Sequence, residues 1–101
     1  MSQRLPPLYA LRAFEAAARH SSFTRAADEL NITQSAVSRH IRTLEEHFAC
    51  RLFVRNGRSL QLSEAARLLL PGVREGFGAL ERACSTLRSE EGVLRMKAVS
   101  Y

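Results

Sequence analysis

Hydrophobic residues in the first half of the chain recur every three or four positions, which is the spacing of one face of an α-helix. Three such segments follow one another: Leu8, Leu11, Phe14 and Ala18; then Phe23, Ala26, Ala27 and Leu30; then Val37, Ile41, Leu44 and Phe48. Pro6 and Pro7 precede the first segment with a fixed φ that suits a helix start, and the segment is expected to end near His20. The pattern predicts three short helices that share one core.

Asn31, Ile32 and Thr33 form the whole connection between the second helix and the third, so this connection must be a tight turn. Asn31 tolerates a left-handed backbone, and Thr33 can cap the third helix with its hydroxyl. Ser22 or Thr24 can cap the second helix in the same way. Two short helices joined by a tight turn predict a helix-turn-helix unit.

Polar side chains fill the side of the third helix that faces away from the predicted core. They are Gln34, Ser35, Ser38, Arg39 and Arg42, with no acidic residue on the same stripe. Gln can pair with adenine, Arg with guanine and Ser with either base, so this set is able to read base edges in a major groove. Glu45 and Glu46 come later, away from the helix start that would enter the groove. A solvated helix face is the simpler alternative, but the stripe, the turn and the preceding helix together favour DNA binding.

A β-hairpin is predicted after the third helix, where two short apolar runs flank Arg55-Asn56-Gly57-Arg58-Ser59. Asn-Gly between such runs is the strongest local signal for a type I′ turn, because both residues accept a positive φ. The hairpin would form a wing, with Arg55 and Arg58 on either side of its tip. Arginines placed there can enter a minor groove or contact a phosphate, and a plain surface turn is the alternative.

From Ser63 onward the apolar spacing becomes long and regular. Ser63 and Glu64 are typical of a helix start. Seven residues follow at spacings of four and three: Ala66, Leu70, Val73, Phe77, Leu80, Cys84 and Leu87. They lie on one coiled-coil-like seam, which predicts a long linker helix that pairs lengthwise with its own copy in a homodimer. The alternative is that the seam covers the chain's own first helix.

The helical pattern stops near Ser89, and Glu90-Glu91-Gly92 is interpreted as a hinge. Residues 93–101 then alternate as a β-strand does, and a strand needs another strand to pair with. The expected organisation is therefore a DNA-binding domain at 1–62, a linker and dimerisation helix at 63–91, and the start of a truncated further domain at 92–101. The expected fold class is mainly α, a winged helix-turn-helix followed by a long helix.

Charge and composition narrow the class of partner. The net charge is +5, and residues 1–62 hold nine Arg against five acidic residues. Arg forms bidentate pairs with phosphate and guanine, so a polyanionic partner is expected. The sequence contains neither a membrane-spanning apolar stretch nor a signal-peptide core, which predicts a cytoplasmic protein. Cys50 and Cys84 have no metal-ligand spacing between them and are expected to be reduced thiols.

Catalysis is not expected, because the sequence offers no constellation of acid, base and nucleophile. His40, His47 and Cys50 lie close to one helix face and could in principle bind a metal, but no fourth ligand is near them. Neither a metal nor another cofactor is therefore expected in these residues. The remaining alternative is a helical protein-interaction and dimerisation module, which would bind all DNA weakly and without sequence preference.

With these residues in view, the chain resembles the DNA-binding region of the LysR-type transcriptional regulators. The resemblance rests on LRAFEAAARHSSFTRAADELNITQSAVSRHIRTLEE, then RLFVR and LQLSEAARLLLP, and it covers Leu8 to about Leu87. It implies a winged helix-turn-helix with a linker helix that pairs with its mate. It also implies that a small-molecule effector is sensed in a missing two-lobed domain, whose first strand would be Leu94 to Val99.

The resemblance also implies roles for individual residues. It makes Gln34, Ser35, Ser38 and Arg39 the readers of the major groove, Thr33 and Ser63 phosphate contacts at helix starts, and Arg55 and Arg58 the wing contacts. The chain departs from the family pattern at Ala49 and Ala66, where the family usually has Gly. Ala accepts a left-handed cap poorly, which leaves the end of the third helix open, whereas Ala66 should strengthen the linker helix. The sequence thus predicts a sequence-specific DNA-binding fragment of a bacterial-type regulator that binds two operator half-sites as a dimer.

Overall fold

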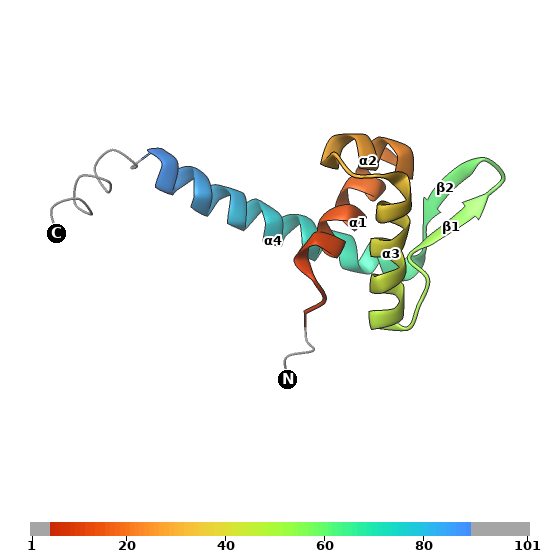
Figure 1. Ribbon diagram of the computed structural model, residues 1–101. Helices are drawn as coiled ribbons and strands as arrows, with labels where there is room; N and C mark the ends of the chain where they lie inside the picture. Colours follow the sequence, from red (N-terminus) through yellow and green to blue (C-terminus); the bar gives the residue numbers. More distant parts are fainter. Residues whose placement is uncertain (1–4, 90–101) are drawn as a thin grey trace, which may run out of the picture.

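The computed structural model describes residues 5–89, and it is mainly α-helical with one small antiparallel hairpin, as predicted (Figure 1). Its elements are α1 (Leu8–His20), α2 (Phe23–Leu30), α3 (Gln34–Phe48), β1 (Phe53–Asn56), β2 (Ser59–Leu62) and α4 (Glu64–Ser89). The predicted hinge at 90–92 and the predicted strand at 93–101 lie outside the described residues. Within residues 5–89, no helix has the length and apolar character needed to cross a membrane.

Helices α1, α2 and α3 enclose the core, and α1 packs against both of the others. Phe14, Val37, Leu44 and Leu52 are its largest fully buried side chains. Phe53 at the base of the hairpin packs edge-on against Phe14 of α1 and Phe23 of α2, so the wing is anchored in the same core. The predicted three-helix core is thus confirmed, and it holds both α3 and the wing in place.

Capping side chains set the helix-turn-helix geometry. The Ser22 hydroxyl accepts a hydrogen bond from the Arg25 amide at 3.1 Å, and the Thr33 hydroxyl accepts one from the Ala36 amide at 3.0 Å. Asn31 ends α2 in the left-handed conformation, with φ 59°. The sequence predictions for Asn31 and Thr33 are confirmed, and Ser22 rather than Thr24 is the cap of α2.

The sequence left open how helix α3 ends, and the structure shows a left-handed cap. Ala49 adopts the left-handed conformation, with φ 56°, although it carries a Cβ that disfavours it. The Glu45 carboxylate accepts a hydrogen bond from the Leu52 amide at 2.9 Å and thereby ties the following loop back to α3. The contact between Glu45 and Leu52 therefore accompanies a left-handed cap at Ala49, a position that Gly would occupy more easily.

The turn of the wing differs by one residue from the prediction. Asn56 pairs with Ser59, so the two turn residues are Gly57 and Arg58, and of these Gly57 alone has a positive φ, at 66°. This is the φ pattern of a type II′ turn rather than type I′. The predicted register would have set Arg55 opposite Arg58, whereas Arg55 lies opposite Leu60 and the repulsion between two directly paired arginines is avoided.

Helix α4 is continuous through Pro71, and its two halves have different surroundings. Ala66, Leu70 and Val73 are buried in the core of the same chain, so the packed unit continues past the predicted boundary at residue 62. Phe77 is partly buried against that core. Leu80, Cys84 and Leu87 are exposed on the part that projects from the domain (Figure 1). The predicted seam is therefore covered by its own chain along its first half, as the alternative interpretation expected.

Candidate nucleic-acid interface

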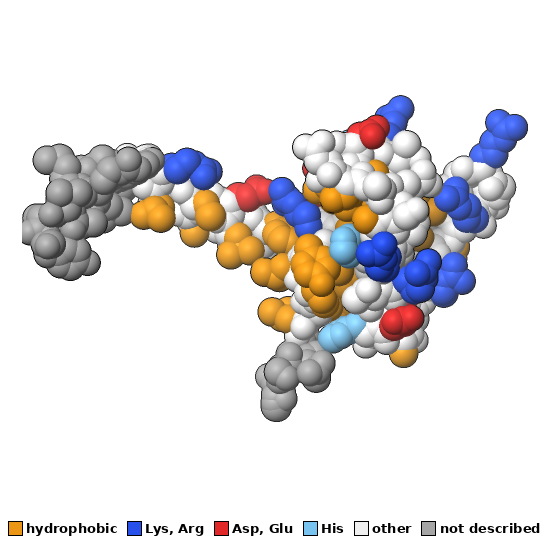
Figure 2. Space-filling view, in the orientation of Figure 1, with side chains coloured by type: hydrophobic (Ala, Val, Ile, Leu, Met, Phe, Trp, Pro, Cys, Tyr) orange, Lys and Arg blue, Asp and Glu red, His pale blue; other side chains and the backbone are white. Residues whose placement is uncertain are grey.

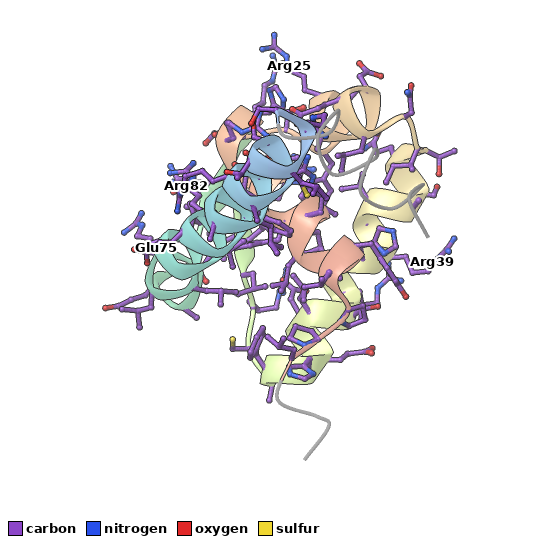
Figure 3. All side chains as sticks on the ribbon, turned by 90° about the vertical axis from the view of Figure 1, so that its left-hand side faces the viewer. Arg25, Arg39, Glu75 and Arg82 are labelled. Atoms are coloured by element: carbon purple, nitrogen blue, oxygen red, sulfur yellow. The ribbon has the colours of Figure 1, made fainter. Side chains whose placement is uncertain are left out.

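The polar stripe of α3 lies on the outside of the domain, as the sequence predicted. Gln34, Ser35, Arg39 and Arg42 are exposed, and Ser38 is half-buried. The core positions of α3 occupy the opposite side of the helix and are fully used by packing. Figure 3 shows Arg39 extending from α3 away from the body of the protein, on the side opposite the labelled side chains of α4. These side chains are free to meet a large partner.

The start of α3 carries unused hydrogen-bond donors. The first backbone N–H groups of any helix have no partner within the helix, and the Thr33 hydroxyl satisfies one of them here. Because that hydroxyl acts as an acceptor, its own proton remains available to an anion. The helix dipole also favours negative charge at this end. The geometry therefore supports the predicted phosphate contact at Thr33.

Gln34 has an orienting contact that the sequence analysis missed. The Thr24 hydroxyl of α2 donates a hydrogen bond to Gln34 Oε1 at 3.1 Å, on the exposed side of the helix-turn-helix. This contact directs the amide while leaving its two N–H donors free, so Gln34 is held ready to pair through its nitrogen. The two residues are ten positions apart, and no local pattern in the sequence indicates that they meet.

The wing adds a second group of basic side chains. Arg55 lies on β1 and Arg58 in the turn itself, and both are exposed. Figure 2 shows basic side chains gathered over α3 and the wing, on the right-hand side of the view. The wing thus places basic side chains on the same side of the protein as those of α3.

Ion pairing distinguishes these arginines from four others of the chain. Arg12, Arg19, Arg51 and Arg74 each lie within 4.0 Å of a glutamate carboxylate. Among the described residues, none of the following has such an acidic partner: Arg39, Arg42, Arg55 and Arg58. Within residues 5–89, the arginines of the α3 and wing side are therefore not held in ion pairs, which leaves them available to a polyanion.

Two acidic residues, Glu15 of α1 and Glu29 of α2, are held by one arginine. Arg19 donates hydrogen bonds to both oxygens of Glu15 and to both oxygens of Glu29, at 2.8–2.9 Å. The hydrogen bond from Arg19, followed by that from His20, lowers the pKa of Glu29 to about 2. The same arginine lowers the pKa of Glu15. This network locks α1 to α2 and keeps both carboxylates charged.

The Ser63 hydroxyl already forms hydrogen bonds within the protein. Its hydroxyl donates a hydrogen bond to the Arg51 carbonyl at 2.7 Å and accepts one from the Ala66 amide at 3.1 Å. Its backbone N–H donates to the Leu52 carbonyl at 2.9 Å. A phosphate contact from the hydroxyl, as the resemblance implied, would require the bond to Arg51 to break. Ser63 therefore acts here as a cap that ties the start of α4 to the loop before the wing.

The histidines once considered as metal ligands are used in packing. The His40 ring lies against Tyr9, with centroids 4.9 Å apart, and the His47 ring lies against Phe48 at 4.8 Å. Within residues 5–89, no three side chains of His, Cys, Asp or Glu come together as a metal site would need.

Comparison with known proteins gives the family. The model described as "Bacterial regulatory helix-turn-helix protein, lysR family" matches residues 8–67. The chain is 51% identical over 96 residues to the glycine cleavage system transcriptional activator of Escherichia coli K12, a match that covers 93% of this chain and 32% of the relative. It is 47% identical over 95 residues to the transcriptional activator AmpR of Citrobacter freundii, covering 90% and 33% respectively. The chain thus spans about a third of the length of these relatives.

Solved structures agree with the sequence matches. The DNA-binding domain of BenM in complex with catB site 1 DNA superimposes with a TM-score of 0.76 at 29% identity, covering 82% of this chain and 93% of that one. Corynebacterium glutamicum OxyR, in a C206S mutant with bound H2O2, superimposes with a TM-score of 0.81 at 28% identity, covering 88% of this chain and 28% of that one. These similarities place the chain among regulatory proteins rather than enzymes. The chain belongs to the lysR family of bacterial regulatory helix-turn-helix proteins.

Proposed function

We propose that this chain is the DNA-binding region of a transcriptional regulator and that it recognises a specific base sequence as a dimer. The observation that carries the proposal is the side formed by α3 and the wing, where Arg39, Arg42, Arg55 and Arg58 have no carboxylate partner among the described residues. BenM, whose DNA-binding domain has the same fold, has been solved bound to DNA. That similarity supports DNA binding by the α3 and wing side of this chain.

In the proposed complex, α3 enters the major groove. Gln34, Ser35, Ser38 and Arg39 read base edges near the start of the helix, with Arg42 one turn further along. The Thr33 hydroxyl and the free amides at the helix start bind a backbone phosphate. Base contacts then supply the discrimination between sequences, and phosphate contacts supply most of the salt-dependent affinity.

The wing extends the contact beyond that groove. Arg58, which lies in the turn, is the foremost of the wing arginines, and Arg55 stands further back on β1. We assign both to phosphate or minor-groove contacts, which depend little on base identity. Ser63 is left out of the contact set, because its hydroxyl holds the loop that leads into the wing. Its part in DNA binding is to position Arg51 and the strands that follow.

Dimerisation is proposed to occur through the projecting part of α4. Leu80 and Leu87 are 51% and 59% exposed there, although a charged residue would be the ordinary choice on a free helix surface. Two copies of α3 would then meet two operator half-sites on one face of the DNA. Because the relatives are about three times as long, we also propose that a small-molecule effector is sensed outside these residues, in a cytoplasmic protein.

Selection from a pool of random duplex DNA, at near-physiological salt, tests this proposal. The parent chain should enrich an inverted repeat, and a Leu80→Asp/Leu87→Asp variant should enrich single half-sites, because both leucines are exposed and the fold does not need them. If both proteins enriched inverted repeats, Leu80 and Leu87 of α4 would not form the dimer contact. Enrichment of nothing by either protein would overturn sequence-specific recognition and leave the protein-interaction module as the explanation.

A further inference from the structure

An exposed aromatic pair joins the start of α1 to the outer surface of α3. The rings of Tyr9 and His40 have their centroids 4.9 Å apart and their planes at 60° to each other. This separation lies within the range of a favourable aromatic contact. Tyr9 is 64% exposed, and among residues 5–89 no protein group forms a hydrogen bond with its hydroxyl. The pair therefore presents a hydrogen-bonding group that packing within the chain does not use.

The start of α1 is a rigid support for Tyr9. The Pro7 carbonyl accepts hydrogen bonds from the amides of Ala10 and Leu11, at 3.1 and 3.3 Å. Ala10 and Leu11, which follow Tyr9, are themselves buried in the core. The backbone that carries Tyr9 is thus fixed, and the His40 ring restricts its side chain. A side chain that is already ordered loses little conformational entropy on binding, so Tyr9 is prepared to contact a partner.

The pair borders the side of α3 that is proposed to read bases. Four residues share one flank of the helix, beside the stripe that contains Arg39, at spacings of four, three and four: Ala36, His40, Thr43 and His47. This flank carries no acidic residue that would repel DNA. Figure 2 shows histidine side chains beside the basic ones over α3, with hydrophobic side chains over the start of α1 next to them. Tyr9 therefore stands at the edge of the surface that α3 presents to DNA.

We propose that the Tyr9 hydroxyl donates a hydrogen bond to a DNA phosphate beside the groove that α3 enters, and that His40 positions the ring. The inference rests on the proposed DNA binding and extends its contact surface to α1. The major groove is about 12 Å wide, and an α-helix with its side chains measures about 10–12 Å across. A helix in the groove therefore brings its two flanks up to the two strand backbones. Gln34, which contacts α2, lies on one flank, and His40 with Tyr9 lies on the other.

A phosphate oxygen suits this hydroxyl better than a base edge does. Tyrosine is among the side chains that contact phosphates, and an ionised acceptor strengthens the hydrogen bond. The bases lie deeper in the groove, within reach of the α3 stripe, whereas Tyr9 comes from a helix outside it. The contact should therefore add affinity without base preference. Because the hydroxyl is uncharged, it should leave the slope of log K against log salt unchanged, unlike the contact of an arginine.

Removal of one oxygen atom tests the contact. Tyr9→Phe keeps the ring and its packing on His40, so the melting temperature should stay within about 3 °C of the parent's. The dissociation constant for the duplex selected with the parent chain should rise about tenfold, by the same factor for single-base variants of that duplex, at an unchanged salt slope. Ser85→Ala removes an exposed hydroxyl from the projecting part of α4 and should leave the constant within about twofold. A changed base preference in Tyr9→Phe would overturn the assignment to a phosphate.

Methylphosphonate substitution locates the phosphate. Each backbone phosphate of the duplex is replaced in turn by an uncharged methylphosphonate, which removes the charge that the hydroxyl would meet. At one position beside the groove, Tyr9→Phe should bind the modified duplex as tightly as the parent does, because the lost partner and the lost hydroxyl belong to one interaction. At the other positions the tenfold ratio should persist. A tenfold ratio at every position would contradict a direct phosphate contact.

Two variants of His40 test its positioning role. His40→Phe keeps an aromatic ring against Tyr9 and should bind DNA within about twofold of the parent, whereas His40→Ala should weaken binding about threefold. Equal weakening by both variants would overturn that role. If the parent selects a sequence but Tyr9→Phe binds every duplex as tightly, the α1 contact is wrong and the proposed function stands. A parent chain that selects no sequence would overturn the proposed function and, with it, this contact.

Discussion

Replacement of Arg39 by alanine separates base reading from general attraction to DNA. Arg39 projects from the exposed side of α3, and its guanidinium has no carboxylate partner among the described residues (Figure 3). The contact that the structure gives this residue is through its backbone, since the Thr43 hydroxyl donates to the Arg39 carbonyl at 3.0 Å. Alanine keeps that contact and favours the helix. The substitution should therefore change stability by less than about 0.5 kcal/mol.

The substitution should lower the binding free energy for the preferred DNA by much more than it changes the folding stability. A bidentate contact between arginine and guanine contributes about 1–3 kcal/mol of discrimination against the wrong base. Since about 1.4 kcal/mol corresponds to a tenfold change in affinity, binding to the preferred sequence should weaken about 5- to 150-fold. Binding to a duplex already altered at the contacted position should hardly change. Preference at one base position should therefore fall while preference at the others remains.

Fluorescence anisotropy can measure these affinities with the selected duplex and with a set of its single-base variants. Arg25→Ala is the matched control, because Arg25 is an exposed arginine that projects from α2, away from Arg39 (Figure 3). It removes the same charge and should weaken all duplexes alike. If Arg39→Ala also weakened all duplexes equally, Arg39 would be a phosphate contact, and its assignment as a base reader would be refuted.

Three further substitutions test the wing, the helix end and the ion-pair network. Arg58→Ala should weaken all DNA sequences alike and make the slope of log K against log salt shallower by about 1, and an altered base preference would argue against a backbone contact. Ala49→Gly should raise the free energy of unfolding in urea by about 1 kcal/mol, since glycine accepts the left-handed φ of 56°; no gain would mean that Ala49 is unstrained. Arg19→Ala should lower it by about 1–2 kcal/mol at pH 7. That deficit should shrink as pH falls from 4.5 toward 2, because the folded pKa of Glu29 is lowered to about 2 and protonation removes the contact; a constant deficit would contradict the network's role.

Local signals predicted most of the helix-turn-helix correctly. The apolar spacing marked α1 to α3, Asn31 took the left-handed turn position, and the Thr33 hydroxyl caps α3. Each of these features depends on residues within about four positions of one another, which is the range over which helix hydrogen bonds and caps act. The stripe of α3 is likewise a local pattern, so its exposure could be predicted from the sequence alone.

Features that depend on distant residues could not be predicted in this way. The register of the wing is set by pairing between its strands, with Phe53 buried opposite Leu62, and the Asn-Gly signal alone placed the turn one residue too early. The contacts of Ser63 and of Thr24 each join residues ten or more positions apart. Such contacts give Ser63 a structural role in the loop and give Gln34 a fixed orientation. Neither role follows from the polar groups of the two side chains alone.

The linker helix shows most clearly where a periodic pattern stops being informative. Spacing of four and three identifies residues on one face of α4, but it does not say what covers that face. The core of the domain buries Ala66, Leu70 and Val73, and Phe77 is partly buried against it. Leu80 and Leu87, which continue the same spacing, are exposed. One periodic pattern therefore describes a packed face at the start of α4 and a solvent-exposed face at its end, because the spacing records only which residues share a side of the helix and not how far the rest of the domain extends.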